Sequence, residues 1–403
     1  MAMGGTGVAS ASKFNASFHN PALIAFNRGD KPDKISISAF MGARELYNES
    51  LNDDIRNFQK SDVRQNYIDA TGSLSTLEEF NEASENFSRE LGNINLSSYR
   101  ADETNAFSLL VDTKPVTINF FTRRDIREIT TILNLDEQII QDNFEFRNYG
   151  SGSSSLMDLD ADLKSSVDNT VFKMTEFGVT VATTNVIEYN MPISWGYTPK
   201  LIQMNGSHQR AKILDYDVTN PPDQQPSVGL LEWNLDIGFA ILLTDSFLEN
   251  ELGLDGFWLE GEWVFGIVGM NMVPTDFQSY GPARSVPELP ATKRAIQPLY
   301  QVGLAHYREN FMVTLDIDLV ETEVWDFEGL TRFVSMGGEY YWRDDFHLRA
   351  GLRINTAQTT EAAKDKAMFT TGFLYQPHGF SIEAAALVND VELGGTVGFG
   401  LAF

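Results

Sequence analysis

The sequence predicts an all-β protein: a transmembrane, antiparallel, up-and-down β-barrel of about fourteen strands. Two observations predict it. Segments in which apolar side chains alternate with small or polar ones recur along most of the chain, and the connections between these segments alternate between long and short. A membrane barrel needs both features, because each strand has a lipid side and a lumen side, and because outer loops are longer than periplasmic turns. A soluble β-sandwich, the alternative for any single alternating segment, gives no reason for alternating loop lengths.

The C-terminal segment, residues 392–403, is the first of these strands that we consider. Its side chains repeat with period two, which gives a strand two different faces. A row of large apolar side chains at a chain end is expected in a membrane barrel, because the outer face meets lipid and the last strand pairs with the first. The opposite face carries small residues. The apolar face carries Leu393, Val397, Phe399, Leu401 and Phe403.

The other predicted strands follow from the same pattern and from turn signals between them. Most of the short connections have about three to six residues. The connection 244–256 is an exception to this alternation of long and short connections, which we call loop parity, because it is long where a short one is expected. The long connections are predicted at 49–103, 134–170, 202–227 and 272–295. The strands are predicted at 34–47, 106–112, 116–123, 171–183, 191–201, 231–243, 257–267, 297–307, 311–320, 330–342, 346–355, 368–375, 380–388 and 392–403.

Residues 49–103 depart from the strand pattern. Their apolar residues have helical spacing, and the segment is otherwise polar. Ser75 and Glu78 form a predicted capping box at a helix start. Loop parity places this helical insertion outside the cell. The predicted organisation is therefore an N-terminal plug at 1–30 and a barrel at 31–403, with the insertion between its first two strands.

Composition narrows the possible functions. The chain has 403 residues, no cysteine and a net charge of −26. Thiol chemistry and cysteine-bound metals are therefore excluded, and a nucleic-acid partner is disfavoured because phosphate binding needs a basic surface. No run of about eighteen apolar residues is present, so no transmembrane helix is predicted. The first residues have neither a basic start nor an apolar core, and we expect a mature chain from which a signal peptide has been removed.

The N-terminal residues resemble those of a known family. Gly4-Gly5-Thr6-Gly7-Val8-Ala9 is followed by Phe18-His19-Asn20-Pro21-Ala22-Leu23. This pair of motifs is similar to the N-terminal segment of the FadL-type outer-membrane channels. In that superfamily a segment with an Asn20-Pro21-Ala22-type motif plugs the barrel from the periplasmic side. The resemblance implies that residues 1–30 fill the lumen; without it, they could be a flexible leader. A barrel of about fourteen strands is too wide to be filled by side chains alone, which favours a plug.

The C-terminal half resembles a branch near those channels. Four short stretches occur in the order found in the barrel proteins named conjugal-transfer TraF-like. That name is shared with a thioredoxin-like protein, but this chain lacks Cys-x-x-Cys, so the redox function does not apply. The stretches are 269–274, 315–319, 338–340 and 348–353.

No catalytic or metal-binding motif is present. The five histidines have no metal-ligand spacing, and no nucleophile elbow or phosphate loop occurs, so we expect neither an enzyme nor a cofactor. Charge on inward faces is the feature that could carry chemistry. It can form a ladder of ion pairs inside the barrel, or an arginine, Arg349 or Arg353, can bind a ligand's carboxylate or phosphate. The inward charged residues are Asp316, Asp318, Glu339, Arg349 and Arg353.

Taken with the resemblance, these features predict a monomeric outer-membrane channel for passive uptake of a hydrophobic or amphipathic small molecule. The expected partners are that ligand and outer-membrane lipid or lipopolysaccharide. The conjugal-transfer name leaves a second function open, a surface or assembly component that acts through its outer loops. A polar porin is a third, which the plug-like N-terminus disfavours.

Overall fold

The computed structural model describes most of the chain. The described residues are 2–26, 34–48, 57–58, 60–71, 76–94, 98–113, 115–133, 165–187, 191–213, 230–251, 253, 260–278, 293–323, 330–357, 367–390 and 392–403. Within these ranges, no helix combines the length and the apolar character that crossing a membrane requires.

Fourteen strands form a closed antiparallel barrel, as predicted. The last strand pairs with the first, so that Phe399 lies opposite Ala39 and the ladder has no free edge. Strands that follow one another in the barrel are neighbours in sequence, which is an up-and-down order. The barrel strands are β1 (Ile35–Asn48), β2 (Ser98–Asp112), β3 (Val116–Leu133), β4 (Ser166–Val186), β5 (Pro192–Lys212), β6 (Leu230–Leu243), β7 (Glu262–Met270), β10 (Leu299–Tyr307), β11 (Phe311–Asp318), β14 (Phe333–Arg343), β15 (Phe346–Asn355), β16 (Met368–Tyr375), β17 (Phe380–Val388) and β18 (Glu392–Ala402).

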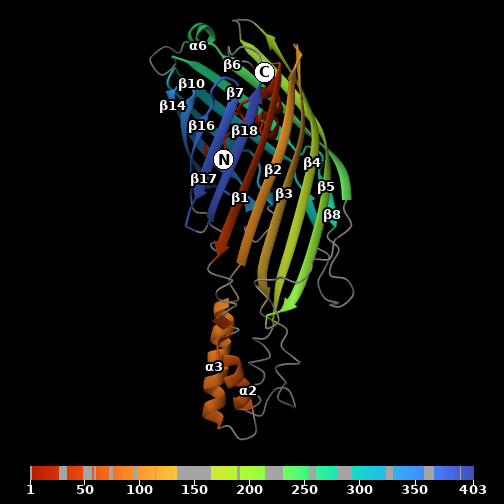
Figure 1. Ribbon diagram of the computed structural model, residues 1–403, viewed down its shortest axis with the longest axis vertical. Helices are drawn as coiled ribbons and strands as arrows, with labels where there is room; N and C mark the ends of the chain where they lie inside the picture. Colours follow the sequence, from red (N-terminus) through yellow and green to blue (C-terminus); the bar gives the residue numbers. More distant parts are fainter. Residues whose placement is uncertain are drawn as a thin grey trace.

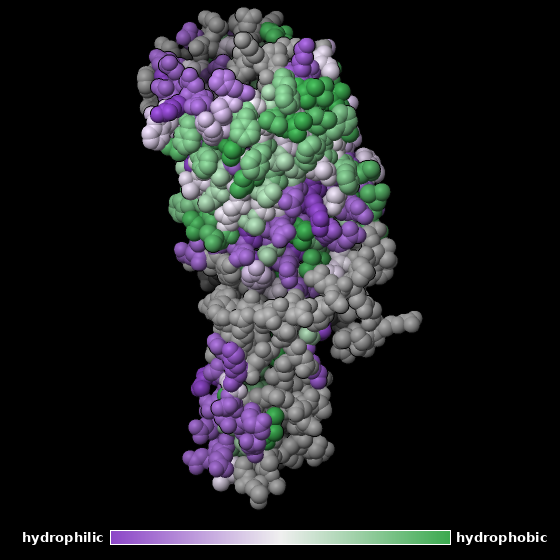
Figure 2. Space-filling model, in the orientation of Figure 1, coloured by the Kyte–Doolittle hydropathy of each residue, from purple (hydrophilic) through white to green (hydrophobic). Residues whose placement is uncertain are grey.

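The outer surface carries the predicted apolar residues. Alternate side chains of each strand point outward, and large apolar ones such as Phe120, Phe177 and Phe399 are about half exposed to the surroundings. On the face that Figure 2 shows, hydrophobic residues form a band across the barrel, bordered by hydrophilic residues on both sides. A continuous apolar band is what a barrel presents to lipid, because a soluble protein of this size leaves no such belt uncovered.

The two ends of the barrel differ. At one end, which we call the turn side, β2 and β3 are joined across 113–115 and β14 and β15 across 344–345. The C-terminus lies at this end (Figure 1). At the other end, which we call the loop side, most connections are long. Two connections break the parity: 244–261, which includes the short helix α6 (Asp245–Asn250), is long on the turn side, and 389–391 is short on the loop side.

Strands β2 to β5 extend far beyond the hydrophobic band on the loop side, as a comparison of Figures 1 and 2 shows. The strand β5 runs over Pro192–Lys212, whereas the sequence predicted that it ends at 201. The predicted strand bounds were wrong here because they followed apolar alternation, and that alternation stops where the strands leave the lipid. Parts of the predicted loops 134–170 and 202–227 are therefore strand, and their remaining residues lie almost entirely outside the described ranges.

The insertion between β1 and β2 contains the helices α2 (Val63–Thr71) and α3 (Leu77–Ile94). Its predicted end at 103 was wrong, since Ser98 already begins β2. The apolar faces of the helices meet each other and the extended ends of β3, β4 and β5. This cluster contains Phe58, Tyr67, Ala70, Phe80, Ala83, Phe87, Leu91, Ile132, Val167 and Ile213.

The start of α3 has a capping box one residue beyond the predicted position. The Thr76 hydroxyl accepts the Glu79 N–H at 3.2 Å, and the Glu79 carboxylate accepts the Thr76 N–H at 2.8 Å. Ser75 of the predicted pair lies outside the described residues. These hydrogen bonds hold the pKa of Glu79 below its usual range.

Two small hairpins lie outside the barrel ladder, both on the loop side. One joins β8 (Thr275–Gln278) to β9 (Lys293–Ile296), and the other joins β12 (Thr322–Glu323) to β13 (Leu330–Thr331). The first lies in the segment that the sequence predicted as a proline-rich loop at 272–295. Residues 257–259, the predicted start of a strand at 257–267, lie outside the described residues, and β7 begins at Glu262.

Candidate functional site

The N-terminal segment, residues 2–26, lies inside the barrel and contacts strands around its whole circumference. It contains two short 3-10 helices, Ala16–Phe18 and Pro21–Ile24. Small polar side chains on the inner wall hold its backbone. Hydrogen bonds join the segment to β1 through Ser38, to β4 through Thr184, to β5 through Ser194, to β10 through Tyr307 and to β16 through Thr370.

Asn20 ties this segment together. Its side chain is fully buried and makes three hydrogen bonds. The amide nitrogen donates to the Val8 carbonyl at 2.7 Å and to the Phe239 carbonyl of β6 at 3.1 Å. The amide oxygen accepts the Ala22 N–H and so caps the second 3-10 helix, in which Pro21 is the first residue. The Asn20-Pro21-Ala22 motif therefore joins two parts of the segment and fixes both to the wall.

Glycines on the inner wall make room for the segment. A Cβ added to any of them would collide with residues 2–21, so these positions accept no larger side chain while the segment stays in place. They follow one another along one arc of the barrel, and the arc is interrupted at β11. We call them the glycine belt: Gly196 of β5, Gly238 of β6, Gly266 of β7, Gly303 of β10, Gly337 of β14, Gly351 of β15 and Gly372 of β16.

Where the belt is interrupted, β11 supplies a carboxylate. Asp316 accepts the N–H of Gly7 at 2.6 Å and the N–H of Val8 at 2.9 Å through one oxygen, Oδ2. Its side chain is buried. Charge-assisted hydrogen bonds of this kind are roughly twice as strong as neutral ones. Asp316, a predicted ligand-binding residue, thus lies against the N-terminal segment.

The segment's own glycines have a similar role. Gly4 has a φ of 67°, a conformation that residues with a Cβ rarely adopt. A Cβ at Gly4 would also lie 2.6 Å from the Leu352 carbonyl of β15. A Cβ at Gly7 would overlap the His19 ring. The Gly-rich motif at the start of the chain is therefore explained by close packing inside the barrel.

A cavity of about 640 Å³ lies in the lumen beside this segment. Gly4, Phe18 and His19 of the segment form part of its wall. On the loop side, Ala295 and Ile296 of β9 also line it. Ile296 is buried against Ile202 of β5, together with Met204, so the β8–β9 hairpin lies inside the barrel. The cavity is thus bounded by the N-terminal segment and by an inward-folded hairpin.

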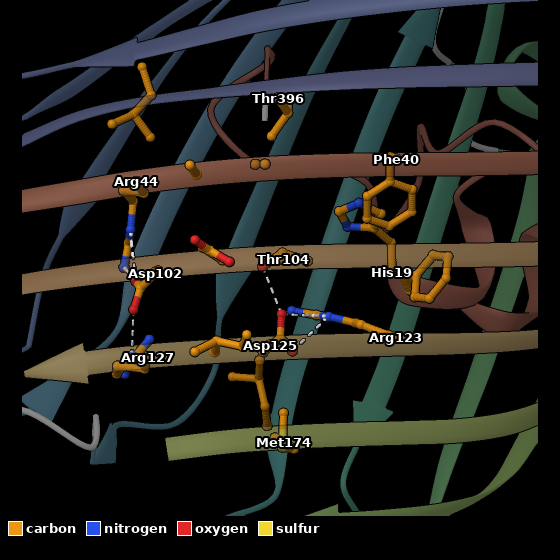
Figure 3. A pocket seen from close by; sticks show the side chains of 18 of the residues that line it. His19, Phe40, Arg44, Asp102, Thr104, Arg123, Asp125, Arg127, Met174 and Thr396 are labelled. Atoms are coloured by element: carbon orange, nitrogen blue, oxygen red, sulfur yellow. Dashed lines mark hydrogen bonds and ion pairs between the residues drawn. The ribbon is translucent and has the colours of Figure 1, made fainter. Parts of the chain in front are cut away.

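Part of the cavity wall is charged. The Asp102 carboxylate of β2 binds Arg44 of β1 at 2.7 Å and Arg127 of β3 at 2.8 Å. Arg123 binds Asp125 along β3 at 2.9 Å. Figure 3 shows these two groups side by side on β1, β2 and β3. Pairing of this kind is needed because an unpaired charge inside the barrel would be costly.

The rest of the wall is largely apolar. The Phe18 ring packs edge-on against the Phe40 ring of β1, with centroids 5.1 Å apart, and against Phe121 of β3 at 4.9 Å. Movement of the N-terminal segment would break these contacts, because Phe18 belongs to it. The cavity therefore offers an apolar surface beside a charged one. Its other large apolar lining residues include Phe172, Met174, Ile296, Leu299, Met368 and Leu387.

A buried ion-pair triad supports the hairpin end of the cavity. Lys200 of β5 lies 3.1 Å from the carboxylate of Glu176 on β4 and 2.9 Å from that of Asp236 on β6. Asp236 also accepts the N–H of Asn271 at 2.7 Å. Asn271 begins the turn that leads from β7 to the β8–β9 hairpin, and it lines the cavity. The triad thus fixes the base of this hairpin to the barrel wall.

The structure separates the predicted site residues. Arg353 lines the cavity, with its guanidinium 3.5 Å from the centre of the Phe333 ring. Arg349 of β15 binds Glu339 on the neighbouring strand β14 and, at 3.0 Å, Glu383 on β17, two strands away. Asp318 accepts hydrogen bonds from the Gln301 side chain at 2.6 Å and from the Phe333 backbone at 2.8 Å. Arg349 and Glu339 thus form ladder pairs, and the role of the predicted residues in ligand binding stays a prediction.

The charged wall around Asp102 was not predicted from the sequence. The predicted helical insertion included Asp102, and the predicted third strand ended at 123, before Asp125 and Arg127. Continuing the alternation inward from Arg123 to Asp125 and Arg127 would have found them, since they share one face at period two. No group of His, Asp and Glu residues suited to a metal ion occurs in the part of the chain that the structure describes.

Sequence comparison assigns the chain to a family. A family model described as "F plasmid transfer operon, TraF, protein" matches residues 17–254. This is more than half of the chain. The chain belongs to this TraF family. No curated protein matches it by sequence.

Two solved structures show how this TraF-family member compares with known barrels. A TodX deltaS2S3 mutant, a monoaromatic hydrocarbon channel, has a TM-score of 0.54 at 13% identity and covers 100% of this chain and 97% of its own. The P. putida toluene transporter TodX has a TM-score of 0.50 at 12% identity, covering 100% of this chain and 99% of its own. At such identities the likeness shows a shared fold. It supports the predicted barrel fold for this TraF-family chain.

Proposed function

We propose that the protein spans the outer membrane and lets a hydrophobic or amphipathic small molecule pass by diffusion. The observation that supports this most directly is the lumenal cavity of about 640 Å³, a volume in the range of small-molecule sites. Its wall suits such a ligand, because rings such as Phe18 and Phe40 contact an apolar body while Arg44 and Arg127 lie where a polar head would find hydrogen bonds.

Closure by the N-terminal segment is part of this proposal. The segment crosses the lumen between the cavity and the turn side, where its backbone is hydrogen-bonded to the wall at many points. A ligand in the cavity reaches the turn side only if residues 2–26 shift. Loop parity makes the turn side periplasmic, so the segment would act as a plug on that side.

A ligand-independent experiment tests the cavity. Thr396 of β18 points into it (Figure 3), and Thr396→Trp should fill much of the space. Val397 is the next residue of the same strand and faces outward, so Val397→Trp is a matched control. Apolar molecules extracted from the purified proteins are identified by mass spectrometry. We expect an enriched compound in the wild type and Val397→Trp that is lost in Thr396→Trp. Identical profiles in all three would contradict a ligand site here.

Removal of the segment tests the plug. A variant without residues 2–26 should conduct ions in a planar bilayer, because the lumen of a barrel this wide is then open. The intact protein should show little conductance. Equal conductance of the two proteins, with folding verified by the slower gel mobility of the heated sample, would mean that the segment does not close the lumen.

A second function is favoured by the loop-side extension. Strands β2 to β5 continue beyond the hydrophobic band and carry α2 and α3 away from the membrane (Figures 1 and 2). A diffusion channel does not require such a projection. The helices could meet another component of a DNA-transfer apparatus, which is the context that the TraF family description names.

Removal of α2 and α3 distinguishes the two proposed functions. Residues 51–96 are replaced by a short Gly-Ser linker that joins β1 to β2. A channel should keep both its bound compound and its response to loss of residues 2–26. A transfer component should lose mating efficiency in a host that depends on this protein for transfer. Full mating efficiency after the replacement would remove support for the second function.

A further inference from the structure

On β2 to β5 the outer surface changes from apolar to mostly polar on the loop side. Strand register places residues of neighbouring strands on common rungs. One rung joins Phe107, Thr122, Phe177, Leu201 and Trp233 across β2 to β6. Its four large apolar members are 47–60% exposed. Aromatic residues at the edge of an apolar band mark the depth of the membrane interface in barrels.

The next rungs outward are mostly polar on β2 to β5. The first joins Asn105, Arg124, Thr175 and Gln203, and the second joins Glu103, Ile126, Lys173 and Asn205. The first rung continues into the exposed apolar residues Met41 of β1 and Leu231 of β6. Their neighbours in sequence, such as Arg123 and Met174, line the internal cavity, so alternation points Arg124 and Lys173 outward. Two cations therefore lie on the outer surface, just beyond the apolar edge.

Arg124 and Lys173 can reach one ligand. Arg124 lies directly opposite Thr175, two residues along β4 from Lys173. Residues in this diagonal relation have Cα atoms about 7–8 Å apart, and both side chains are long. A tetrahedral anion can accept hydrogen bonds from both, with the guanidinium binding two oxygens and the ammonium a third.

Their lack of partners distinguishes them from the charges inside the barrel. The inward arginines Arg44, Arg123 and Arg349 are all in ion pairs. Across the described residues, the structure gives neither Arg124 nor Lys173 an ion pair or side-chain hydrogen bond. The protein has a net charge of −26, so two unpaired cations on neighbouring strands form a local positive site on an otherwise acidic chain. An external anion would explain both the charge and the depth.

We propose that Arg124 and Lys173 bind a phosphate group of a lipid in the outward-facing leaflet. Lipid is favoured over a soluble anion because the aromatic rung lies directly beneath, where acyl chains would cover Phe107 and Phe177. Basic side chains near a membrane surface are attracted to anionic head groups.

The test is native mass spectrometry of the full-length protein in detergent, titrated with bisphosphorylated lipid A. Arg124→Gln/Lys173→Gln should bind this lipid about tenfold to thirtyfold more weakly than the wild type, as loss of two interfacial cations predicts. The matched control is Lys34→Gln/Arg343→Gln, which removes the same two charges from exposed positions at the turn side. It should bind like the wild type. Slower gel mobility of heated samples verifies that all variants are folded.

Two further ligands identify what is recognised. Dephosphorylated lipid A should bind all proteins equally weakly, and inorganic phosphate in tenfold excess over the lipid should not displace bisphosphorylated lipid A. Equal affinity of the wild type and Arg124→Gln/Lys173→Gln would overturn the proposal, and so would equal weakening by the control pair. Displacement by inorganic phosphate would show a free-anion site instead of a lipid site. None of these outcomes depends on whether the barrel is a channel.

Discussion

The two halves of the lumen are built in different ways. The turn-side half is filled by backbone: residues 2–26 lie against glycines and small hydroxyls of the wall, and Asn20 and Asp316 bind them by hydrogen bonds. The loop-side half is lined by side chains: Arg44, Asp102 and Arg127 form ion pairs around an open cavity. The turn-side wall thus packs against the N-terminal segment, and the loop-side wall surrounds an open cavity.

The difference shows what each residue type does in a wide barrel. A glycine belt has no side chains of its own to fill space, so it depends on an inserted segment. Charged side chains fill space and form ion pairs with one another. An apolar ligand cannot replace these ion pairs, so they stay in place when such a ligand binds. The turn-side half is therefore suited to opening by displacement, whereas the loop-side half is suited to holding a ligand without rearrangement.

We expect the largest effect on the turn-side half from a larger side chain in the glycine belt. A Cβ at Gly337 would lie 2.5 Å from the Met3 side chain of the segment, so Gly337→Val should push the segment away from β14. Overpacking of this kind costs about 1–3 kcal/mol, which favours the displaced segment by a factor of roughly 5 to 150. Bilayer conductance should rise, and trypsin should cut after Lys13 faster than in the wild type.

Gly338 is the control for this substitution. It follows Gly337 on β14 but faces outward, and a Cβ there would meet its nearest neighbour at an ordinary 3.7 Å. Gly338→Val should leave conductance and the Lys13 cleavage rate unchanged. If the two variants behave alike, space on the inner wall is not what holds the segment.

A smaller effect is expected from Asp316→Asn. The amide still accepts a hydrogen bond from Gly7 or Val8, but it loses the negative charge. A hydrogen bond to a neutral group is weaker by about 1 kcal/mol, so the population with a displaced segment should rise about fivefold. The cleavage rate at Lys13 reports this. Asp318→Asn changes an acceptor that binds Gln301 and Phe333 instead, and it should leave cleavage unchanged; an equal response would show that Asp316 has no special part in holding the segment.

The barrel itself could be predicted from sequence because lipid imposes a strict pattern. Outward residues such as Leu401 and Phe403 must be apolar, and each strand repeats the rule. The pattern ends where the strands leave the lipid, which is why the ends of β3 and β5 were placed too early. The start of β2 was likewise placed too late, so Asp102 fell outside the predicted strands. The charged half of the cavity therefore could not be predicted from apolar alternation.

The filling of the turn-side half by the N-terminal segment could be predicted only from the resemblance of its motifs to a known family. The motif around Asn20 indicates a segment inside the barrel, but the partners of that segment are far away in sequence. Gly266 and Gly351 look like ordinary inward strand residues until the segment is placed against them. Asp316 was identified as an inward charge, and its actual contacts with Gly7 and Val8 depend on the path of the segment, which no local pattern encodes.

The smallest effect should come from the helices, which belong to neither half. Thr76→Ala removes the hydroxyl that caps α3, and amide exchange in the first turn should become about fivefold faster. Lowering the pH should act in the same direction, because the pKa of Glu79 is held below its ordinary value. The stabilisation of α3 by the Glu79 carboxylate is fully present at pH values above the ordinary pKa of glutamate. It is lost as the pH falls through the lowered pKa of Glu79. Conductance and Lys13 cleavage should not change; a change in either would show that the helices are coupled to the lumen.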